Sequence, residues 1–351
     1  MLYSFKNDYS EGAHINILKA LIDSNLEQQN GYGLDEYCEK ASRLIRNKIN
    51  NQEADIHFVS GGTQANLIII SSILRPYESV ISASTGHINV HETGAIEAMG
   101  HKINTINSLD GKVTIEGIKE ILELHQDEHM VKPRLVFISN STELGTIYSK
   151  QELQELSSFC RENNLYLHLD GARLGSALAS KYNDLTLEDI ANLVDVFYIG
   201  GTKNGALLGE AIVINNEELK TNFRYNIKQK GAMLAKGKVL GVQFLELFKD
   251  DLYYSLAEHA NNMAYKISEE LETLGYEFLA KPVSNQVFPI LDNEFIEELS
   301  KLYGFNIECK INENKSAIRL VTSWATKEEA VDEFIDNFKR IEADMKKLKT
   351  C

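Results

Sequence analysis

The sequence predicts an α/β protein with a large domain built on a mostly parallel sheet, followed by a small α+β domain. Two observations support this prediction. From about residue 56 to residue 214, short apolar segments alternate with amphipathic ones, which is typical of a parallel sheet covered by helices on both faces. After about residue 274 the pattern changes to shorter strand-like pieces interleaved with helical stretches. We therefore assign 1–245 to the N-terminal segment and large domain, and 246–351 to the small domain.

The predicted strands of the large domain are short, largely apolar runs, and the predicted helices between them carry apolar residues at helical spacing. The strands cover 56–59, 80–81, 135–138, 165–169, 194–199 and 211–214, and the helices cover 63–74, 92–99, 113–125 and 150–162. Few helix breakers occur between Lys236 and Leu274, so we expect long helices that link the two domains. The small domain is predicted to have strands at 287–291, 305–310 and 318–322, and helices at 293–303 and 326–348.

Bulk composition excludes several classes of function. The chain has 351 residues and a formal net charge of −15, which argues against nucleic acid or anionic membrane as a partner. Its four cysteines lie far apart, without the paired spacing of a zinc site or a disulfide framework, so no metal site is predicted. The N-terminal residues lack the apolar core of a signal peptide. We expect a soluble cytoplasmic protein.

The stretch from 165 to 203 contains the strongest chemical signal. One predicted strand ends at Asp170 and is followed by Arg173, and the next leads into Gly200-Gly201-Thr202-Lys203. Open α/β sheets bind their ligands at the carboxyl ends of the strands. A lysine and a carboxylate in this arrangement suit pyridoxal phosphate, because Lys203 can form a Schiff base with the aldehyde while Asp170 keeps the pyridine nitrogen protonated. Taken individually, Lys203 could instead be an exposed loop lysine, and Asp170 could be a helix N-cap.

A glycine turn, Gly61-Gly62-Thr63, follows the 56–59 strand and opens a predicted helix. Free backbone N–H groups at such a helix start can bind a phosphate, and Thr63 adds a hydroxyl. The alternative is an ordinary strand-to-helix turn that Thr63 caps.

His87 lies just past the predicted strand at 80–81. Its imidazole could stack on a cofactor ring and act as an acid or base near neutral pH, or it could be structural. His91 and His101 have no equally informative context, and we predict that they are surface or packing residues. One side chain of the Asn140–Glu143 segment could reach the 3-hydroxyl of the cofactor, although turn formation explains this segment equally well.

Arg319 interrupts the apolar strand predicted at 318–322. An arginine there could bind a substrate carboxylate. Its alternative role is an edge charge that prevents aggregation. Arg173 could likewise be a surface residue of the helix that follows Asp170.

Together these residues match a known family. From Asn7 to about Phe338 the chain resembles the low-specificity L-threonine aldolases, which belong to the fold-type-I (aspartate aminotransferase-like) pyridoxal-phosphate enzymes and the wider β-eliminating lyase group. The most specific segments of the resemblance are Ser60–Thr63, His87 with Glu92–Ala95, His168–Arg173, Thr202-Lys203 and Arg319–Trp324.

The resemblance implies a role for each candidate residue. The expected catalytic residues are Lys203, His87 and Asp170. The residues expected to bind pyridoxal 5′-phosphate are Gly61, Gly62, Thr63, His87, Asp170, Thr202 and Lys203, and those expected to bind the amino-acid substrate are Asn7, Arg173 and Arg319. The resemblance also implies a homodimer or homotetramer with shared active sites, in which Tyr32 and the segment 228–236 are candidates for reaching the partner.

The implied reaction is retro-aldol cleavage of L-threonine or L-allo-threonine to glycine and an aldehyde, with His87, directly or through a water, as the preferred base. Alternatives are a β-eliminating lyase or an aminotransferase of the same fold, and a non-catalytic binding module. The chain departs from the family pattern in four places, one of which is that Gly31–Asp35 lacks the proline often found a little further on. Thr202 replaces the usual serine, Asn204 the usual glycine, and Asn7 stands in an opening that is more commonly Ser-Asp-Thr.

Overall fold

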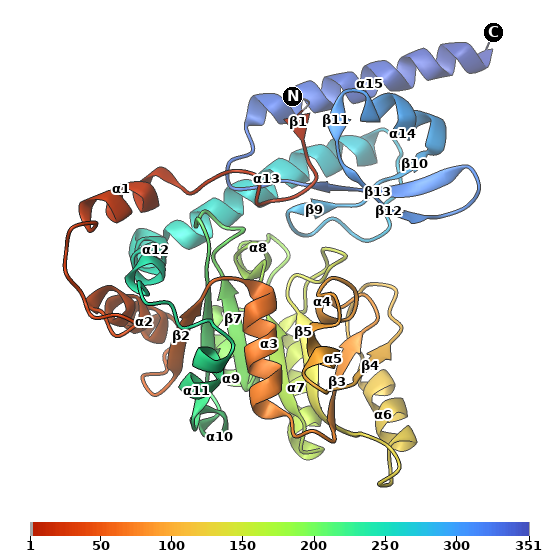
Figure 1. The fold of residues 1–351 in the computed structure, drawn as a ribbon. Helices are drawn as coiled ribbons and strands as arrows, with labels where there is room; N and C mark the ends of the chain where they lie inside the picture. Colours follow the sequence, from red (N-terminus) through yellow and green to blue (C-terminus); the bar gives the residue numbers. More distant parts are fainter. Residues whose placement is uncertain (1–2, 351) are drawn as a thin grey trace.

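The computed structural model describes residues 3–350 and shows two domains joined by a long helix (Figure 1). The large domain contains a seven-stranded sheet in the order β2-β8-β7-β6-β5-β3-β4. Neighbouring strands from β7 to β4 are parallel, whereas β8 is antiparallel to both β2 and β7. The prediction of a mostly parallel sheet is therefore confirmed. The strands are β2 (Asp55–Val59), β3 (Glu78–Ala83), β4 (Ile103–Ile106), β5 (Lys132–Ser139), β6 (Tyr166–Asp170), β7 (Val196–Gly200) and β8 (Glu210–Ile214).

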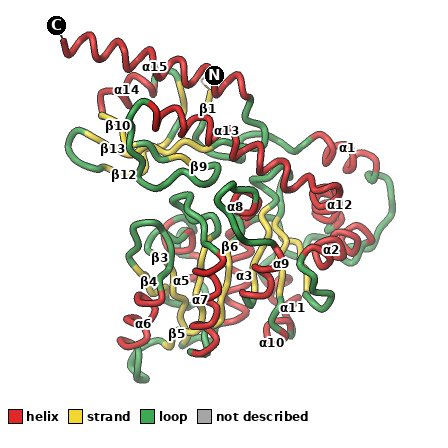
Figure 2. The backbone as a smooth tube through the Cα atoms, turned by 180° about the vertical axis from the view of Figure 1, so that it is seen from behind, coloured by secondary structure: helices red, strands yellow, loops and turns green. Residues whose placement is uncertain are grey.

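Helices cover both faces of this sheet, because successive side chains of a buried strand point to opposite sides. Val196 and Tyr198 of β7 pack against Ile68 and Ile69 of α3, whereas Phe197 belongs to the core on the other face. Figures 1 and 2 view the molecule from opposite sides and show α3 in front of the sheet in one and α7 in front in the other. One face carries α3 (Gly62–Ile73), α4 (His87–Val90), α5 (Ala95–Ala98) and α11 (Phe223–Gln229), and the other carries α2 (Glu36–Lys48), α6 (Ile115–Leu124), α7 (Lys150–Glu162), α9 (Leu187–Leu193) and α12 (Lys238–Phe248). The remaining helices are α1 (Ile15–Asp23), α8 (Leu174–Leu178) and α10 (Glu217–Lys220).

The small domain packs helices against an antiparallel sheet. Its strands are β9 (Gln286–Val287), β10 (Ile290–Asp292), β12 (Asn306–Lys310) and β13 (Lys315–Val321), and its helices are α14 (Asn293–Ser300) and α15 (Glu328–Thr350). The N-terminal strand β1 (Tyr3–Ser4) pairs with β11 (Tyr303–Gly304), and Phe5 is fully buried in the same core. The chain therefore starts in the small domain and then crosses to the large one.

The long helix α13 (Leu252–Thr273) belongs to both domains. Tyr253 and Leu256 pack into the large-domain core, whereas Met263 and Ile267 pack into the small-domain core. The short 3₁₀ turn η1 (Lys249–Asp251) separates α13 from α12. The two cores thus divide within α13, several residues beyond the boundary that the sequence predicted at 245/246.

Local geometry explains where the observed elements differ from the predicted ones. The helix predicted at 92–99 is reduced to the short helix α5, because Thr93 and Gly94 just before it adopt left-handed backbone conformations (φ 53° and 69°), and the short helix α4 that precedes them was not predicted. Helices α1 and α2 and strand β4 had no predicted counterpart. No helix within 3–350 is long and apolar enough to span a membrane. Cys38, Cys160 and Cys309 are free thiols, while Cys351 lies outside the described residues.

Candidate active site

A cavity of about 570 Å³ opens where the parallel strands of the large domain end. Its walls come from the N-terminal segment, from loops and helix starts of the large domain, and from β12 and β13 of the small domain. Nine residues predicted as site members line this one cavity: Gly61, Gly62, Thr63, His87, Asp170, Arg173, Thr202, Lys203 and Arg319. The edge of the sheet and the small domain together therefore assemble residues that are far apart in the sequence.

Asp170, the last residue of β6, is buried and held by three hydrogen bonds. The Tyr198 hydroxyl donates to Oδ1 at 2.5 Å, the Ala172 backbone N–H donates to Oδ1 at 3.0 Å, and the Asn66 amide donates to Oδ2 at 2.9 Å. Burial alone would raise the pKa of Asp170, but nearby His87 and these donors outweigh burial and hold the pKa below its ordinary value. The residue is thus an ionised carboxylate, as a partner for a protonated ring nitrogen must be.

Lys203 lies in the loop between β7 and β8, and the buried acid Glu210 begins β8. Burial and the nearby Arg173 lower the pKa of Lys203, which favours the neutral, nucleophilic amine. Burial raises the pKa of Glu210 to about 8, which opposes ionisation of this carboxyl at neutral pH. Glu210 accepts hydrogen bonds from the Thr202 hydroxyl at 2.9 Å and the Gly201 N–H at 3.0 Å. Thr202 therefore fixes the loop that carries Lys203, and its hydroxyl also accepts a hydrogen bond from the Gly209 N–H at 3.0 Å.

The predicted phosphate-binding turn lies at the same cavity. Gly61, Gly62 and Thr63 line it, and α3 begins at Gly62. The N-cap of this helix is Gly61, without a side-chain capping hydrogen bond, so Thr63 is not the cap that the alternative reading required. The first N–H groups of a helix have no partner within the helix and can bind an anion. A Cβ atom on Gly62 would lie 2.9 Å from the hydroxyl of Tyr198, the residue that donates a hydrogen bond to Asp170. Helix α3 can therefore approach Tyr198 this closely only with glycine at position 62.

His87 begins α4 and is linked to Asp170 through a chain of buried polar groups. Its Nδ1 lies 2.8 Å from the Oε1 atom of Glu92, whose side chain is 0% exposed. The Asn66 amide donates to this same Oε1 atom at 2.9 Å and also to Asp170. Burial would lower the pKa of His87, but the hydrogen bond to Glu92 and the charge of Asp170 raise it above its ordinary value.

The two predicted arginines lie in different surroundings. The Arg173 guanidinium binds Asp8 with Nε at 2.7 Å from Oδ2 and Nη2 at 3.1 Å from Oδ1. Asp8 also accepts a hydrogen bond from the Asn285 amide at 2.9 Å. Arg319 reaches the cavity from β13, and its Nε donates to Gln286 at 3.1 Å. Both arginines keep further N–H groups that can bind a carboxylate.

The surroundings of Asn7 and His91 differ in part from those that the sequence predicted. Asn7 does not line the cavity: its amide oxygen accepts hydrogen bonds from the Tyr9 N–H and the Ser10 hydroxyl, and its neighbour Asp8 occupies the position next to Arg173. His91, predicted to be a surface or packing residue, is exposed as predicted and also lines the cavity together with His87. The four-residue spacing of the two histidines, one helical turn, was the signal that could have revealed this.

Glu143 also lines the cavity, although from the sequence it could not be distinguished from the other residues of the Asn140–Glu143 turn. Its Oε1 atom accepts hydrogen bonds from the Ser139 hydroxyl at 2.8 Å and the His87 N–H at 2.9 Å. Burial raises the pKa of Glu143. Asn66, Glu210 and Asp8 also had no predicted role, and each of them supports a predicted site residue.

Comparison with known proteins is consistent with this geometry. The family model described as beta-eliminating lyase matches residues 16–294. The low specificity L-threonine aldolase of Pseudomonas aeruginosa is 33% identical over 332 residues, which cover 94% of this chain and 95% of that protein. The chain belongs to the beta-eliminating lyase family.

Solved structures agree with this family membership. The structure of a threonine aldolase from Leishmania major has a TM-score of 0.95 and 50% sequence identity, and covers 97% of this chain and 99% of that one. An aspartate aminotransferase of Thermus thermophilus, at 15% identity and a TM-score of 0.72, covers 97% of this chain and 91% of that one and shares the fold. The predicted aspartate aminotransferase-like fold and the predicted family are therefore confirmed.

Members of this family are lyases that depend on pyridoxal 5′-phosphate, and the residues present fit this cofactor. The uncapped start of α3 suits the phosphate, the ionised Asp170 suits a protonated ring nitrogen, and the amine of Lys203 suits the aldehyde. All three line the same cavity.

Proposed function

We propose that this protein cleaves L-threonine, L-allo-threonine and related β-hydroxy-α-amino acids to glycine and an aldehyde. The observation that carries the proposal is the cavity that combines Lys203 and Asp170 with two arginines, one from each domain. The relatives that cover nearly the whole chain are named threonine aldolases, which supports the same reaction.

When bound, pyridoxal phosphate supplies the aldehyde that takes up the substrate amine and a ring that withdraws electrons from the substrate's α-carbon. In our proposal Lys203 is the residue that holds the aldehyde, and Asp170 holds the ring nitrogen. The N–H groups at the start of α3, from Gly61 to Thr63, hold the phosphate. Thr202 holds the loop that carries Lys203 in place through its hydrogen bond to Glu210, and both Thr202 and Lys203 line the cavity.

Arg173 and Arg319 are proposed to bind the carboxylate of the substrate. Two of the five guanidinium N–H groups of Arg173 are engaged by Asp8, so three are available to a ligand. Because Asp8 fixes the guanidinium, the substrate carboxylate meets an oriented donor rather than a mobile one. Fixing the carboxylate orients the Cα–Cβ bond, which must be aligned with the ring before it can break.

The cleavage also needs a base for the proton of the β-hydroxyl. His87, His91 and Glu143 line the cavity and are titratable groups of the right type.

We propose in addition that the protein acts as a homodimer or homotetramer in the cytoplasm. Tyr32 is 46% exposed and does not line the cavity of its own chain. The Lys228 ammonium lies 4.8 Å from the centroid of the Tyr32 ring, and the backbone N–H of Tyr32 donates a hydrogen bond to the Ala235 carbonyl at 3.3 Å. The Tyr32 turn and the 228–236 segment thus form one surface that would be available to a second copy.

The function is tested by incubating the purified, cofactor-loaded protein with L-threonine and with L-allo-threonine and measuring acetaldehyde and glycine. We expect equal amounts of the two products without any keto acid present. Release of pyruvate and ammonia from serine, or a reaction that requires a keto-acid acceptor, would instead favour the β-eliminating lyase or the aminotransferase. A protein that binds the cofactor but converts no amino acid would support the binding module. Sedimentation equilibrium tests the oligomeric state.

A further inference from the structure

Two histidines one helical turn apart line the active-site cavity, and their surroundings differ. His87 begins α4 and His91 immediately follows it, with their ring centroids 5.5 Å apart. Both line the cavity that contains Lys203 and Asp170. When neighbouring groups titrate in different environments, the environments assign the acid and the base.

The surroundings of His87 favour its charged form. Its Nδ1 hydrogen bonds to Glu92 at 2.8 Å, and the side chain of Glu92 is fully buried. The Oε1 atom of Glu92 is also bound by Asn66, while its buried Oε2 atom has no hydrogen-bond partner within residues 3–350. A buried carboxylate is costly unless a charge compensates it, and His87 is the cation at hydrogen-bond distance. A protonated imidazole carries N–H donors on both nitrogens and cannot accept a proton.

The surroundings of His91 favour its neutral form. Partial burial is the main cause that lowers the pKa of His91, and the positive charges of His87 of α4 and Arg319 of β13 lower this pKa further.

The acidic groups around the same cavity are already bound, with one exception. Asp170 is bound by Tyr198 and Asn66, Glu143 by Ser139 and the His87 N–H, and Glu210 by Thr202 and Gly201. Glu308 of β12 is the remaining acid of the lining, and no hydrogen bond joins it to His91. Within the described chain, the His91 side chain itself has no hydrogen-bond partner, so a ring nitrogen is free to accept a proton.

We propose that His91 is the catalytic base that accepts the proton of the substrate's β-hydroxyl, while His87, paired with Glu92, stays a cation. This inference rests on the proposed aldolase function and names its base. In the step, the O–H bond breaks and its proton passes to a ring nitrogen of His91. The O–H electron pair becomes the second carbon–oxygen bond of the aldehyde as the Cα–Cβ bond breaks. The Cα–Cβ pair stays on Cα until a proton is returned there, which gives glycine.

The protonation states can be measured without any catalysis. Histidine C2–H signals of the cofactor-free protein are followed by NMR as a function of pH and assigned with His87→Asn and His91→Asn. We expect His91 to titrate below 6.5 and His87 above it. Replacing Glu92 in Glu92→Gln removes the carboxylate charge and should lower the pKa of His87. The reverse order of the two midpoints would overturn the proposal.

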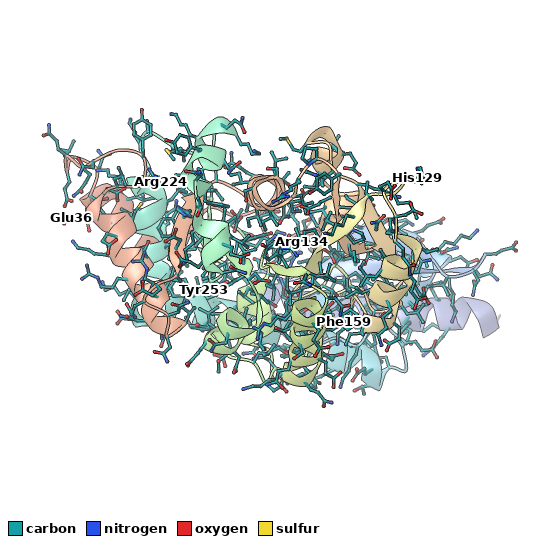
Figure 3. All side chains as sticks on the ribbon, turned by 90° about the horizontal axis from the view of Figure 1, so that it is seen from below. Glu36, His129, Arg134, Phe159, Arg224 and Tyr253 are labelled. Atoms are coloured by element: carbon teal, nitrogen blue, oxygen red, sulfur yellow. The ribbon has the colours of Figure 1, made fainter. Side chains whose placement is uncertain are left out.

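Kinetics of His91→Asn test the catalytic role. General bases contribute about 10²- to 10⁴-fold, so we expect kcat with L-threonine to fall by about 100-fold or more. KM should change little, the absorbance of the bound cofactor should be unchanged, and the acidic limb of the kcat/KM profile should disappear. His129→Asn is the control, because His129 is exposed in a loop and does not line the cavity (Figure 3).

The outcomes separate the base from the reaction. If the wild-type protein cleaves threonine and His91→Asn keeps both its kcat within about twofold and its acidic limb, His91 is not the base. If the wild-type protein releases no aldehyde from any β-hydroxy amino acid, the proposed function fails, whatever the NMR titration shows. Loss of both activity and cofactor absorbance in His91→Asn would assign His91 to cofactor binding instead, and would likewise overturn the proposal.

Discussion

The buried ion pair between Asp8 and Arg173 allows a quantitative prediction. Asp8 is 1% exposed and the Arg173 side chain 11% exposed, and the pair joins the N-terminal segment to the helix start after β6. In Asp8→Asn the shape is kept, but Arg173 retains a buried charge without its carboxylate. Breaking one partner of a buried pair costs about 3–5 kcal/mol of the free energy of unfolding. For a chain of this length that corresponds to a fall in Tm of about 4–7 °C.

The assay is thermal unfolding of the cofactor-free protein, followed by circular dichroism at a fixed protein concentration, because subunit association also affects Tm. Lys301→Ala is the matched control, since it breaks the Lys301–Glu298 pair, whose side chains are 63% and 50% exposed. Exposed pairs contribute little, so its Tm should change by less than about 1 °C.

A double variant sharpens the test. In Asp8→Asn combined with Arg173→Gln neither charge remains buried alone, so its loss of Tm should be smaller than the sum of the two single losses. The reasoning is refuted if Asp8→Asn unfolds within about 1 °C of the wild-type protein. It is also refuted if the two single losses simply add.

Three further predictions concern the cofactor and pH. Lys203→Ala should keep its circular dichroism spectrum but lose the visible absorbance of the bound cofactor, and an unchanged absorbance would show that another residue holds the aldehyde. Tyr198→Phe removes the hydroxyl that donates a hydrogen bond to Asp170 at 2.5 Å. A hydrogen bond to a charged group contributes about 1.5–3 kcal/mol. Cofactor affinity, measured by fluorescence titration, should therefore fall about 10- to 100-fold. Tyr166→Phe, which removes a hydroxyl bonded to exposed Glu218, is its control, and equal affinities in the two variants would contradict the assignment. Burial lowers the pKa of both His57 and His168 to about 4, so the unfolded chain binds protons more readily than the folded one below pH 6.5. The free energy of unfolding, measured in urea, should therefore be highest above about pH 6.5 and fall by about 2 kcal/mol per histidine between pH 7 and pH 5. His57→Asn should show a smaller fall. A free energy of unfolding that does not change over this pH range would disprove the prediction.

Local sequence signals were sufficient where an element combines an apolar run with clear ends. Helix α7 begins and ends as predicted, because Ser149 and Glu152 form a capping box at its start and Leu153 and Leu156 form its buried face. Strands β6 and β7 lie within one or two residues of the predicted runs. Strand β4 was missed because four residues, Ile103–Ile106, are too few for alternation to show.

The site was predictable to the extent that its residues stand at the ends of predicted strands. Asp170 and Lys203 met this condition, and so did Gly61–Thr63. Asn66 did not, since it lies inside an apolar helix and acquires its function from Asp170, 104 residues further along. Asp8 likewise has no local feature that indicates Arg173, from which it is separated by 165 residues.

The sequence by itself determined the fold class and the pair of groups that suits pyridoxal phosphate, because apolar periodicity and strand-end chemistry are local properties of the chain. Only the tertiary structure decided which arginine has a carboxylate partner, which histidine faces Glu92 and which faces cations. Those properties depend on burial and on charges brought together from both domains, and both quantities exist only once the chain has folded. For His87 and His91, four residues apart, the tertiary environment thus determines which of the two can accept a proton.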